Sequence, residues 1–193
     1  MRYQLAIFDM DGTLTEELLD FEAIRREIGL PEKAPIIEHI ALLDPDRRRL
    51  GQAILDRHEM AAAETCRLRP GAADVLAELR LRGVKTALLT RNSRACADRI
   101  LTRHHLLLDH VATREDLPHK PHPEAITRIV RLLGAELRQT LMIGDFLFDL
   151  QTAEAAGTDS ALLSVRSDGQ WPPYYAMATH RIRSLTELLA IVA

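Results

Sequence analysis

Short apolar runs that alternate with helical patterns dominate this sequence of 193 residues. Each run is short enough to be a strand buried on both faces of a sheet. Strands that alternate with helices in this way predict βαβ units and an α/β fold with a doubly wound, mainly parallel sheet. The runs are Leu5–Phe8, Val84–Leu89, Thr140–Ile143 and Ser160–Val165, with weaker ones at His110–Ala112 and His180–Ile182.

The helical patterns between these runs repeat apolar residues at helical spacing. In the first of them, Val75, Leu76 and Leu79 share one face, and Gly83 follows as a helix-ending residue. The alternation persists to the end of the chain. The predicted helices are Ala72–Arg82, Ser93–Leu106, Pro123–Leu133, Leu147–Ala156 and Leu185–Val192.

One long segment, residues 15–69, breaks the alternation because it contains no strand signal. Glu16–Ile28 predicts one helix and Pro45–Thr65 predicts another. A structureless loop of this length is uncommon in a compact domain, so we expect an inserted lobe of small helices. The predicted organisation is a core of residues 1–14 and 70–193 with a helical cap of residues 15–69.

The composition excludes several classes of protein. Hydrophobic content of 47% and charged content of 27% are ordinary for a soluble globular protein. The net charge of −3 gives no positive field to attract nucleic acid or an anionic membrane. No apolar run approaches the ~20 residues of a membrane helix, and the first residues do not resemble a signal peptide. Since Cys66 and Cys96 match no metal spacing, we expect free thiols and a cytoplasmic protein.

The strongest functional signal is an apolar strand that ends in two carboxylates. The run Leu5–Phe8 leads directly into Asp9 and Asp11, which Gly12 and Thr13 follow. Two like charges about 4 Å apart repel by about 4 kcal/mol at an effective dielectric near 20. A divalent cation, or a proton held on one carboxylate, would relieve that repulsion. The alternative is a turn, because aspartate also favours strand-to-helix loops.

Other polar residues follow the remaining strands, at the sheet edge where α/β proteins bind ligands. Together they offer carboxylates, a hydroxyl, a helix N-terminus and an ammonium, which suit a phosphoryl group with a divalent cation. They are Thr90, Arg91, Asn92 and Ser93 after the second strand, Lys120 in a proline-bounded loop, and Asp145 and Asp149 after the fourth strand.

In this order, the motifs Asp-x-Asp-Gly-Thr, strand-Thr, Lys-Pro and Gly-Asp-x-x-x-Asp resemble those of the haloacid dehalogenase superfamily. The chain is most similar to its phosphoglycolate phosphatase-like members, which carry a small helical cap after the first motif. The resemblance spans nearly the whole chain and is weakest in the cap. It implies a Rossmann-like core and a magnesium-dependent phosphatase that hydrolyses a small phosphomonoester through an aspartyl-phosphate.

The resemblance also implies a role for each motif residue. Asp9 is expected to be the nucleophile, and Asp11 the general acid and then the base. Lys120 is expected to neutralise charge on the nucleophile and on the phosphoryl group. The implied phosphate-binding residues are Gly12, Thr90, Arg91, Asn92 and Lys120. The implied magnesium ligands are Asp9, the backbone carbonyl of Asp11, Asp145 and, directly or through water, Asp149.

Three features keep more than one interpretation. Asp149 either contributes to the metal site or positions Lys120, and its charge also suits the start of a helix. Arg91 either reaches the substrate or points to solvent. The segment Trp171–Tyr175 either lines the rim of the site or packs on the sheet edge.

Two functions compete with hydrolysis. A phosphomutase of the beta-phosphoglucomutase type uses the same aspartyl-phosphate, but its cap must exclude water from the site. The short lobe predicted here is less suited to that than to hydrolysis. A non-catalytic protein that binds phosphorylated metabolites is the other alternative, and the intact motif set argues against it. In each case the expected partner is a small phosphorylated metabolite, with no nucleic acid and no membrane.

Overall fold

The computed structural model describes residues 2–17, 19–116, 118–165 and 169–192. Within these residues, six strands form one sheet in the order β3-β2-β1-β4-β5-β6, and every neighbouring pair is parallel. The α/β fold predicted from the sequence is therefore confirmed. The strands are β1 (Leu5–Phe8), β2 (Lys85–Leu89), β3 (His110–Ala112), β4 (Thr140–Gly144), β5 (Asp159–Leu163) and β6 (His180–Ile182).

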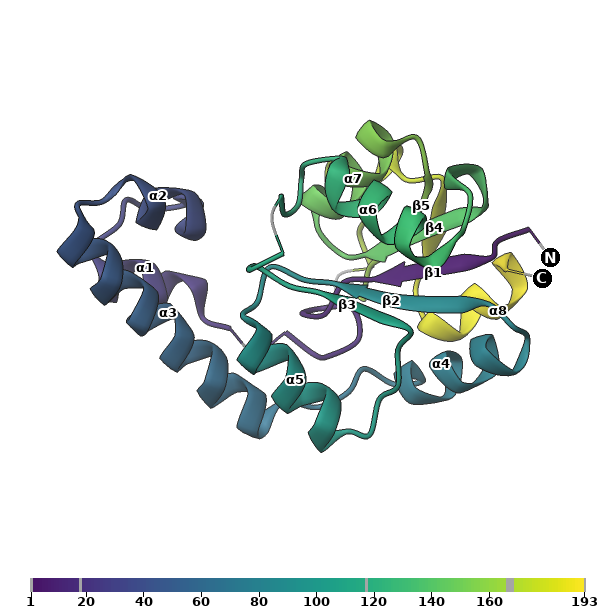
Figure 1. Cartoon of the computed structure of the whole chain (residues 1–193), viewed down its shortest axis with the longest axis horizontal. Coiled ribbons are helices and arrows are strands. Elements are labelled where there is room, and N and C mark those ends of the chain that lie inside the picture. The colour runs from purple at the N-terminus through teal and green to yellow at the C-terminus, as the bar shows by residue number, and fades with distance from the viewer. Residues whose placement is uncertain (1, 18, 117, 166–168, 193) are drawn as a thin grey trace.

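Helices cover both faces of the sheet (Figure 1). Along β1, the side chains of Ala6 and Phe8 pack on one face with α4, α5 and α8, whereas Leu5 and Ile7 pack on the other with α6 and α7. The strands are thus buried on both sides, as the apolar runs predicted. The helices are α4 (Ala72–Leu81), α5 (Arg94–Arg103), α6 (Glu124–Leu133), α7 (Leu147–Ala156) and α8 (Leu188–Ile191), with 3-10 turns at Leu137–Gln139, Tyr175–Met177 and Leu185–Glu187.

Three helices stand to one side of the sheet, beyond the carboxyl ends of the strands (Figure 1). They are α1 (Phe21–Ile28), α2 (Ile36–Leu42) and α3 (Pro45–Thr65). A small apolar core of their own holds them together, formed by Ile24, Ile36, Ile40 and Leu55. We call these three helices the helical lobe. Its treatment as a separate cap of residues 15–69 stays a prediction.

Two details of the helical lobe differ from the expectations. The first helix begins at Phe21 rather than Glu16, because the side chain of Asp20 accepts a hydrogen bond from the backbone N–H of Ala23 at 2.9 Å and caps the helix there. The second helix, α2, was not predicted. It is only 7 residues long and begins immediately after Pro35, so its apolar pattern is too short to stand out.

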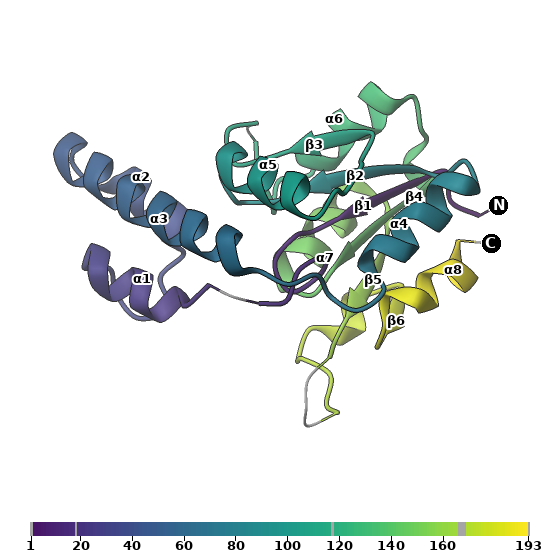
Figure 2. The same cartoon turned by 90° about the horizontal axis from the view of Figure 1, so that it is seen from below.

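The two segments that connect the helical lobe to the sheet lie side by side. The backbone N–H of Glu16 donates to the carbonyl of Arg67 at 2.9 Å, and that of Arg69 donates to the carbonyl of Leu14 at 2.9 Å. An isolated antiparallel bridge joins the same two segments. The chain therefore leaves the sheet and returns to it at one place, and the ends of the chain lie on the far side of the sheet (Figure 2).

Two further expectations from composition can be compared with the structure. None of the helices in the described ranges is both long enough and apolar enough to cross a membrane. The thiols of Cys66 and Cys96 are buried and form no disulfide, in agreement with the expectation of free cysteines.

Candidate active site

Three aspartates and one lysine meet at the carboxyl ends of β1 and β4. Asp9 directly follows β1, and its backbone N–H continues the pairing with β4 by donating to Ile143 at 2.8 Å. Asp145 directly follows β4, and Asp149 lies in the first turn of α7, the next helix. The ammonium of Lys120 donates to Asp9 and, at 2.6 Å, to Oδ1 of Asp149. Lys120 is only 3% exposed, so its charge depends on these two carboxylates.

The arrangement of the carboxylates suits a hard divalent cation. Asp9, Asp145 and Asp149 each offer one oxygen, and these oxygens all lie within 4.8 Å of one another. Burial and the nearby carboxylates raise the pKa of Asp9, while Lys120 opposes the shift. Burial, and then the charge of Asp149, raise the pKa of Asp145 to about 7. A set made only of carboxylate oxygens fits Mg²⁺ better than zinc, and a cation among them would offset both shifts.

Asp11 is not among these three carboxylates and instead contacts the loop that follows β2. The side-chain amide of Asn92 donates to Oδ2 of Asp11 at 2.6 Å. Burial raises the pKa of Asp11 to about 6, although the hydrogen bond from Asn92 acts in the opposite direction. The two aspartates of the first motif therefore occupy different surroundings: Asp9 faces an ammonium, and Asp11 faces a neutral amide. Different surroundings are what different roles for two carboxylates require.

Two glycines let the backbone approach the acidic residues closely. Gly12 has a φ of +78°, and a Cβ atom there would lie 2.2 Å from Oδ2 of Asp145. At Gly144, the last residue of β4, a Cβ atom would lie 2.2 Å from Cγ of Asp149. The sequence suggested a phosphate-binding role for Gly12 but none for Gly144. Thr13 is a second residue without a predicted role, and its hydroxyl donates to Oδ1 of Asp145 at 3.1 Å.

Gly144→Ala is expected to weaken Mg²⁺ binding by about 10- to 100-fold, the usual effect of disturbing residues that support metal ligands. The added methyl group would push Asp149 away from its bond with Lys120. Calorimetric titration of Mg²⁺ measures the change. Gly83→Ala is the control, because Gly83 has a φ of +73° but nothing within 4 Å of the added atom. Unchanged Mg²⁺ affinity in Gly144→Ala would contradict this account of the site.

The loop after β2 joins the sheet edge to the start of α5. The backbone N–H of Asn92 donates to the hydroxyl of Thr90 at 3.1 Å, and Ser93 caps α5 by accepting from Cys96 at 3.3 Å. Thr90, Asn92 and Ser93 are all buried. Because Asn92 also holds Asp11, this loop and the N-terminus of α5 lie beside the first motif. We call residues 90–93 the phosphate loop, after their expected role.

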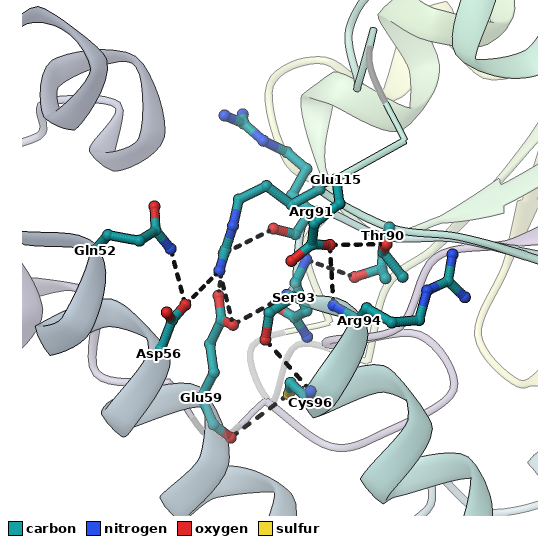
Figure 3. Close-up of polar contacts among 12 residues, drawn as sticks. Gln52, Asp56, Glu59, Thr90, Arg91, Ser93, Arg94, Cys96 and Glu115 are labelled. Carbon is teal, nitrogen blue, oxygen red and sulfur yellow. Dashed lines mark hydrogen bonds and ion pairs between the residues drawn. The ribbon is translucent and has the colours of Figure 1, made fainter. Parts of the chain in front are cut away.

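An ion cluster built on a buried arginine and a buried glutamate connects the helical lobe to the phosphate loop (Figure 3). Arg114, which follows β3, donates to the carboxylate of Glu59 on α3 and to Asp56 at 2.6 Å. The same guanidinium donates to the carbonyl of Arg91 at 3.2 Å, and Glu59 accepts from the backbone N–H of Ser93 at 3.0 Å. We call Arg114, Glu59 and Asp56 the Arg114 cluster. It fixes both α3 and the phosphate loop relative to the sheet.

The sequence interpretation did not identify the Arg114 cluster, although one signal for it exists. Glu59 lies four residues from both Leu55 and Ala63, and all three are buried on the same face of α3. A carboxylate on an apolar helix face predicts a buried cation partner. The position of that partner, Arg114, depends on the tertiary fold, since no local pattern links α3 to the end of β3.

Aromatic side chains form a rim next to the acidic residues. Tyr174 donates its hydroxyl to the carbonyl of Asp145 at 3.1 Å, and its ring meets that of Phe146 edge to face at 6.1 Å. A cavity of about 330 Å³ opens here, with Gly12, Asp145, Phe146 and Tyr174 in its lining. Both interpretations of the segment Trp171–Tyr175 apply, because Tyr174 lines this cavity while Trp171 and Tyr174 also pack against Leu150 and Leu162 at the sheet edge.

Arg91 has a different environment from the other motif residues. Its guanidinium donates to Glu38 of α2 at 2.5 Å and lies 4.9 Å from the ring centroid of Phe148. The structure thus brings Asp9, Lys120, Asp145 and Asp149 into one group. Asp11, Asn92 and Thr90 form a second group, which follows the ends of β1 and β2. The structure places the side chain of Arg91 at the boundary with the helical lobe.

Without metal, we expect the free energy of unfolding to decrease as the pH rises from about 6.5 to 8, because below 6.5 the partly buried His110 and His180, whose pKa burial lowers, act in the opposite direction. The pKa values of Asp11 and Asp145, about 6 and about 7, exceed their ordinary value of 3.8. Over this range the folded protein keeps protons that the unfolded chain has already released, so raising the pH favours unfolding. Urea denaturation in chelator at several pH values measures the slope. A free energy of unfolding that rises over this range would contradict the expectation.

Comparisons with known proteins agree with this geometry. The model of a hydrolase family, the haloacid dehalogenase-like hydrolases, matches residues 3–157. An uncharacterized hydrolase of Saccharomyces cerevisiae is 30% identical over 171 residues, which cover 84% of this chain and 78% of the relative. The N-acetylmuramic acid 6-phosphate phosphatase of Pseudomonas aeruginosa is 30% identical over 192 residues, which cover 83% of this chain and 81% of the relative.

A solved structure shows the same fold. The crystal structure of a predicted phosphoglycolate phosphatase from Haemophilus somnus superposes with a TM-score of 0.79 at 20% identity, covering 100% of this chain and 99% of the other. The family model covers most of the sheet and the residues that meet at its edge. The chain therefore belongs to the haloacid dehalogenase-like hydrolase family, and it is a hydrolase of the phosphatase type.

Proposed function

We propose that this protein is a magnesium-dependent phosphatase that hydrolyses a small phosphomonoester through an aspartyl-phosphate on Asp9. The observation that carries the proposal is the buried contact of Asp9 with Lys120, beside two further carboxylates and next to Asp11. The phosphatase name of the Pseudomonas aeruginosa relative supports the reaction type. Neither that name nor the fold transfers a substrate to this chain.

In the first step, a carboxylate oxygen of Asp9 attacks phosphorus and forms a new O–P bond. The bond between phosphorus and the substrate oxygen breaks, and the proton of Asp11 passes to the departing alkoxide. Lys120 lies against Asp9 and holds the attacking carboxylate in place. Asn92 holds Asp11 on its other side, which orients the proton donor.

In the second step, water attacks the phosphorus atom of the aspartyl-phosphate. Asp11, now ionised, takes a proton from this water, the O–P bond to Asp9 breaks, and phosphate leaves. Asp9 and Asp11 return to their starting states. A carboxylate is a good leaving group, which is why an aspartate suits the nucleophile's role in both steps.

Asp9, Asp145 and Asp149 would hold Mg²⁺, together with the backbone carbonyl of Asp11. When bound, the ion supplies charge stabilisation for phosphoryl oxygens. Asp149 also contacts Lys120, so the two interpretations of this residue do not exclude each other. Thr90 and the N-terminus of α5 are proposed to bind the remaining phosphoryl oxygens, as the position of the phosphate loop beside Asp11 supports.

Asp11→Asn is expected to slow turnover by about 10²- to 10⁴-fold for an alkyl phosphate, the usual contribution of a general acid. The loss should be much smaller for p-nitrophenyl phosphate, whose leaving group departs without a proton. Phosphate release with both substrates and Mg²⁺ measures the difference. An equal loss with both would contradict the acid role of Asp11. Asp74→Asn on α4 is the control, because it removes a carboxylate that has no place in the site.

The same assay separates the competing functions. Release of phosphate from p-nitrophenyl phosphate that stops on chelation supports the phosphatase. Turnover that begins only with a sugar bisphosphate primer would support a phosphomutase instead. Binding of phosphorylated metabolites with no turnover of any of them would support the non-catalytic alternative.

Two expectations from the sequence are part of this proposal. The first is that the helical lobe, as the cap of residues 15–69, chooses the small phosphorylated metabolite that is hydrolysed. The position of the lobe over the carboxyl ends of the strands supports this (Figure 1). The second is a cytoplasmic location, which the free, buried thiols of Cys66 and Cys96 support.

A further inference from the structure

Arg91 lies where the phosphate loop, α7 and the helical lobe meet. It directly follows Thr90, and its guanidinium is stacked on Phe148, the residue before Asp149. Its ion pair with Glu38 crosses to α2 of the helical lobe. A leaving group that extends from a phosphoryl group at Asp9 toward the helical lobe would approach this guanidinium.

The ion pair between Arg91 and Glu38 is incomplete. Nη2 of Arg91 donates to Oε1 of Glu38, whereas Nε of Arg91 and Oε2 of Glu38 are shielded from water and have no hydrogen-bond partner in the described part of the chain. An arginine and a carboxylate usually pair through two parallel hydrogen bonds. The guanidinium therefore has an unused donor, and Glu38 leaves a buried oxygen unsatisfied, which is unfavourable for both groups.

The Arg114 cluster already joins the helical lobe to the core, so the incomplete Arg91–Glu38 pair is not needed for that purpose. Arg114 donates to two carboxylates and one carbonyl, and its side chain and that of Glu59 are only 9% and 2% exposed, although Asp56 is 45% exposed. The side chains of Arg91 and Glu38 are more accessible than those of Arg114 and Glu59, at 18% and 40%. Arg114 and Glu59 therefore form the more buried connection. A competing anion can reach the Arg91–Glu38 pair and replace Glu38.

We propose that Arg91 is the receptor for a second anionic group of the substrate, carried on its leaving group, and that Glu38 is an internal competitor for this receptor. The inference rests on the proposed phosphatase function. When the substrate is absent, the carboxylate of Glu38 balances the charge of Arg91. A carboxylate or a second phosphate on the substrate would displace Glu38 and use the free Nε donor as well. Arg91 would therefore bind the leaving group of the substrate rather than the phosphoryl group that is transferred.

Three phosphomonoesters with the same carbon chain test the proposal: hydroxypropyl phosphate, phosphooxypropanoate and propanediol bisphosphate. The end that does not react is a neutral hydroxyl in the first ester, a carboxylate in the second and a phosphate in the third. The readout is the preference of the enzyme, the ratio of kcat/KM for a charged ester to that for the neutral ester. The two charged esters distinguish a carboxylate from a phosphate as the second anion.

Arg91→Gln is expected to lower this preference by roughly tenfold, equivalent to about 1.4 kcal/mol. Glu38→Gln is expected to raise it by roughly threefold, because Arg91 loses its competitor while the neutral glutamine keeps the shape of the side chain. The two variants thus move the preference in opposite directions. Arg99→Gln and Glu22→Gln are matched controls from other ion pairs, and they should leave the preference unchanged.

An ion pair that only fastens the lobe to the core predicts something else: both variants would then change all three esters by the same factor. That result, or a preference that neither variant moves, would overturn the proposal. Failure of the wild type to hydrolyse any ester would count against the phosphatase function instead. In that case, dissociation constants from calorimetry with the same esters still test the inference. Arg91→Gln should weaken the binding of the charged esters relative to the neutral one, and Glu38→Gln should strengthen it.

Discussion

Asp9→Asn is expected to lower kcat/KM for p-nitrophenyl phosphate by roughly 10⁴- to 10⁶-fold, the range seen when a nucleophile that works with partner groups is removed. Asparagine keeps the shape of the side chain but cannot form an aspartyl-phosphate. The effect should be this large because Asp9 is held in place by its contact with Lys120 and by the pairing of β1 with β4.

The variant should remain folded. One negative charge leaves a crowded group of carboxylates, and Lys120 keeps its bond to Asp149 at 2.6 Å. A thermal melt checks this point. Acid quenching of a reaction with labelled substrate checks the chemistry, since the wild type should trap labelled phosphate on the protein and the variant should not. Full activity in a folded Asp9→Asn protein would remove Asp9 from the mechanism.

Glu59→Leu is expected to destabilise the protein by about 3 kcal/mol, at the lower end of the range for breaking a buried ion pair. Arg114 would keep its bond to Asp56 but lose its buried partner, and Ser93 would lose the acceptor of its backbone N–H. For a chain of this length, the melting temperature should fall by about 6 to 12 °C. Urea denaturation with a fixed m-value measures the change.

The neighbouring ion pair on the same helix provides the control. Glu64 of α3 pairs with Arg99 of α5, and both side chains are about half exposed. Glu64→Leu should therefore change the free energy of unfolding by less than about 1 kcal/mol. The double variant Glu59→Leu with Arg114→Leu should lose less free energy of unfolding than the two single variants lose together, because it leaves neither charge of the pair without its partner. Equal effects of Glu59→Leu and Glu64→Leu would contradict the importance of the Arg114 cluster.

The sheet and much of the site were predictable because both depend on short stretches of sequence. A parallel strand buried on two faces needs a continuous apolar run, and each run here corresponds to a strand within one or two residues at its ends. Since parallel strands present their carboxyl ends at the same edge, Asp9 and Asp145 had to converge. Lys120 was expected at the same edge from its proline-bounded loop, and the structure puts it in contact with Asp9.

The parts that sequence did not predict depend on pairing over long distances. The contact of Arg114 with Glu59 joins residues 55 positions apart, and no period or local motif encodes it. The need for glycine at position 144 arises only when α7 folds back and brings Asp149 against β4. The helix α2 is too short for its apolar pattern to exceed the background.

The paired connections at the base of the helical lobe have a consequence for how such proteins diversify. Because Glu16 and Arg67 are hydrogen-bonded neighbours, the segment between them is an excursion that leaves the sheet and returns to it at one place. A different excursion could be spliced in at the same two points without altering the register of any strand. A replacement excursion would also have to supply the carboxylate of Glu59, because Arg114 and the backbone N–H of Ser93 both donate to it.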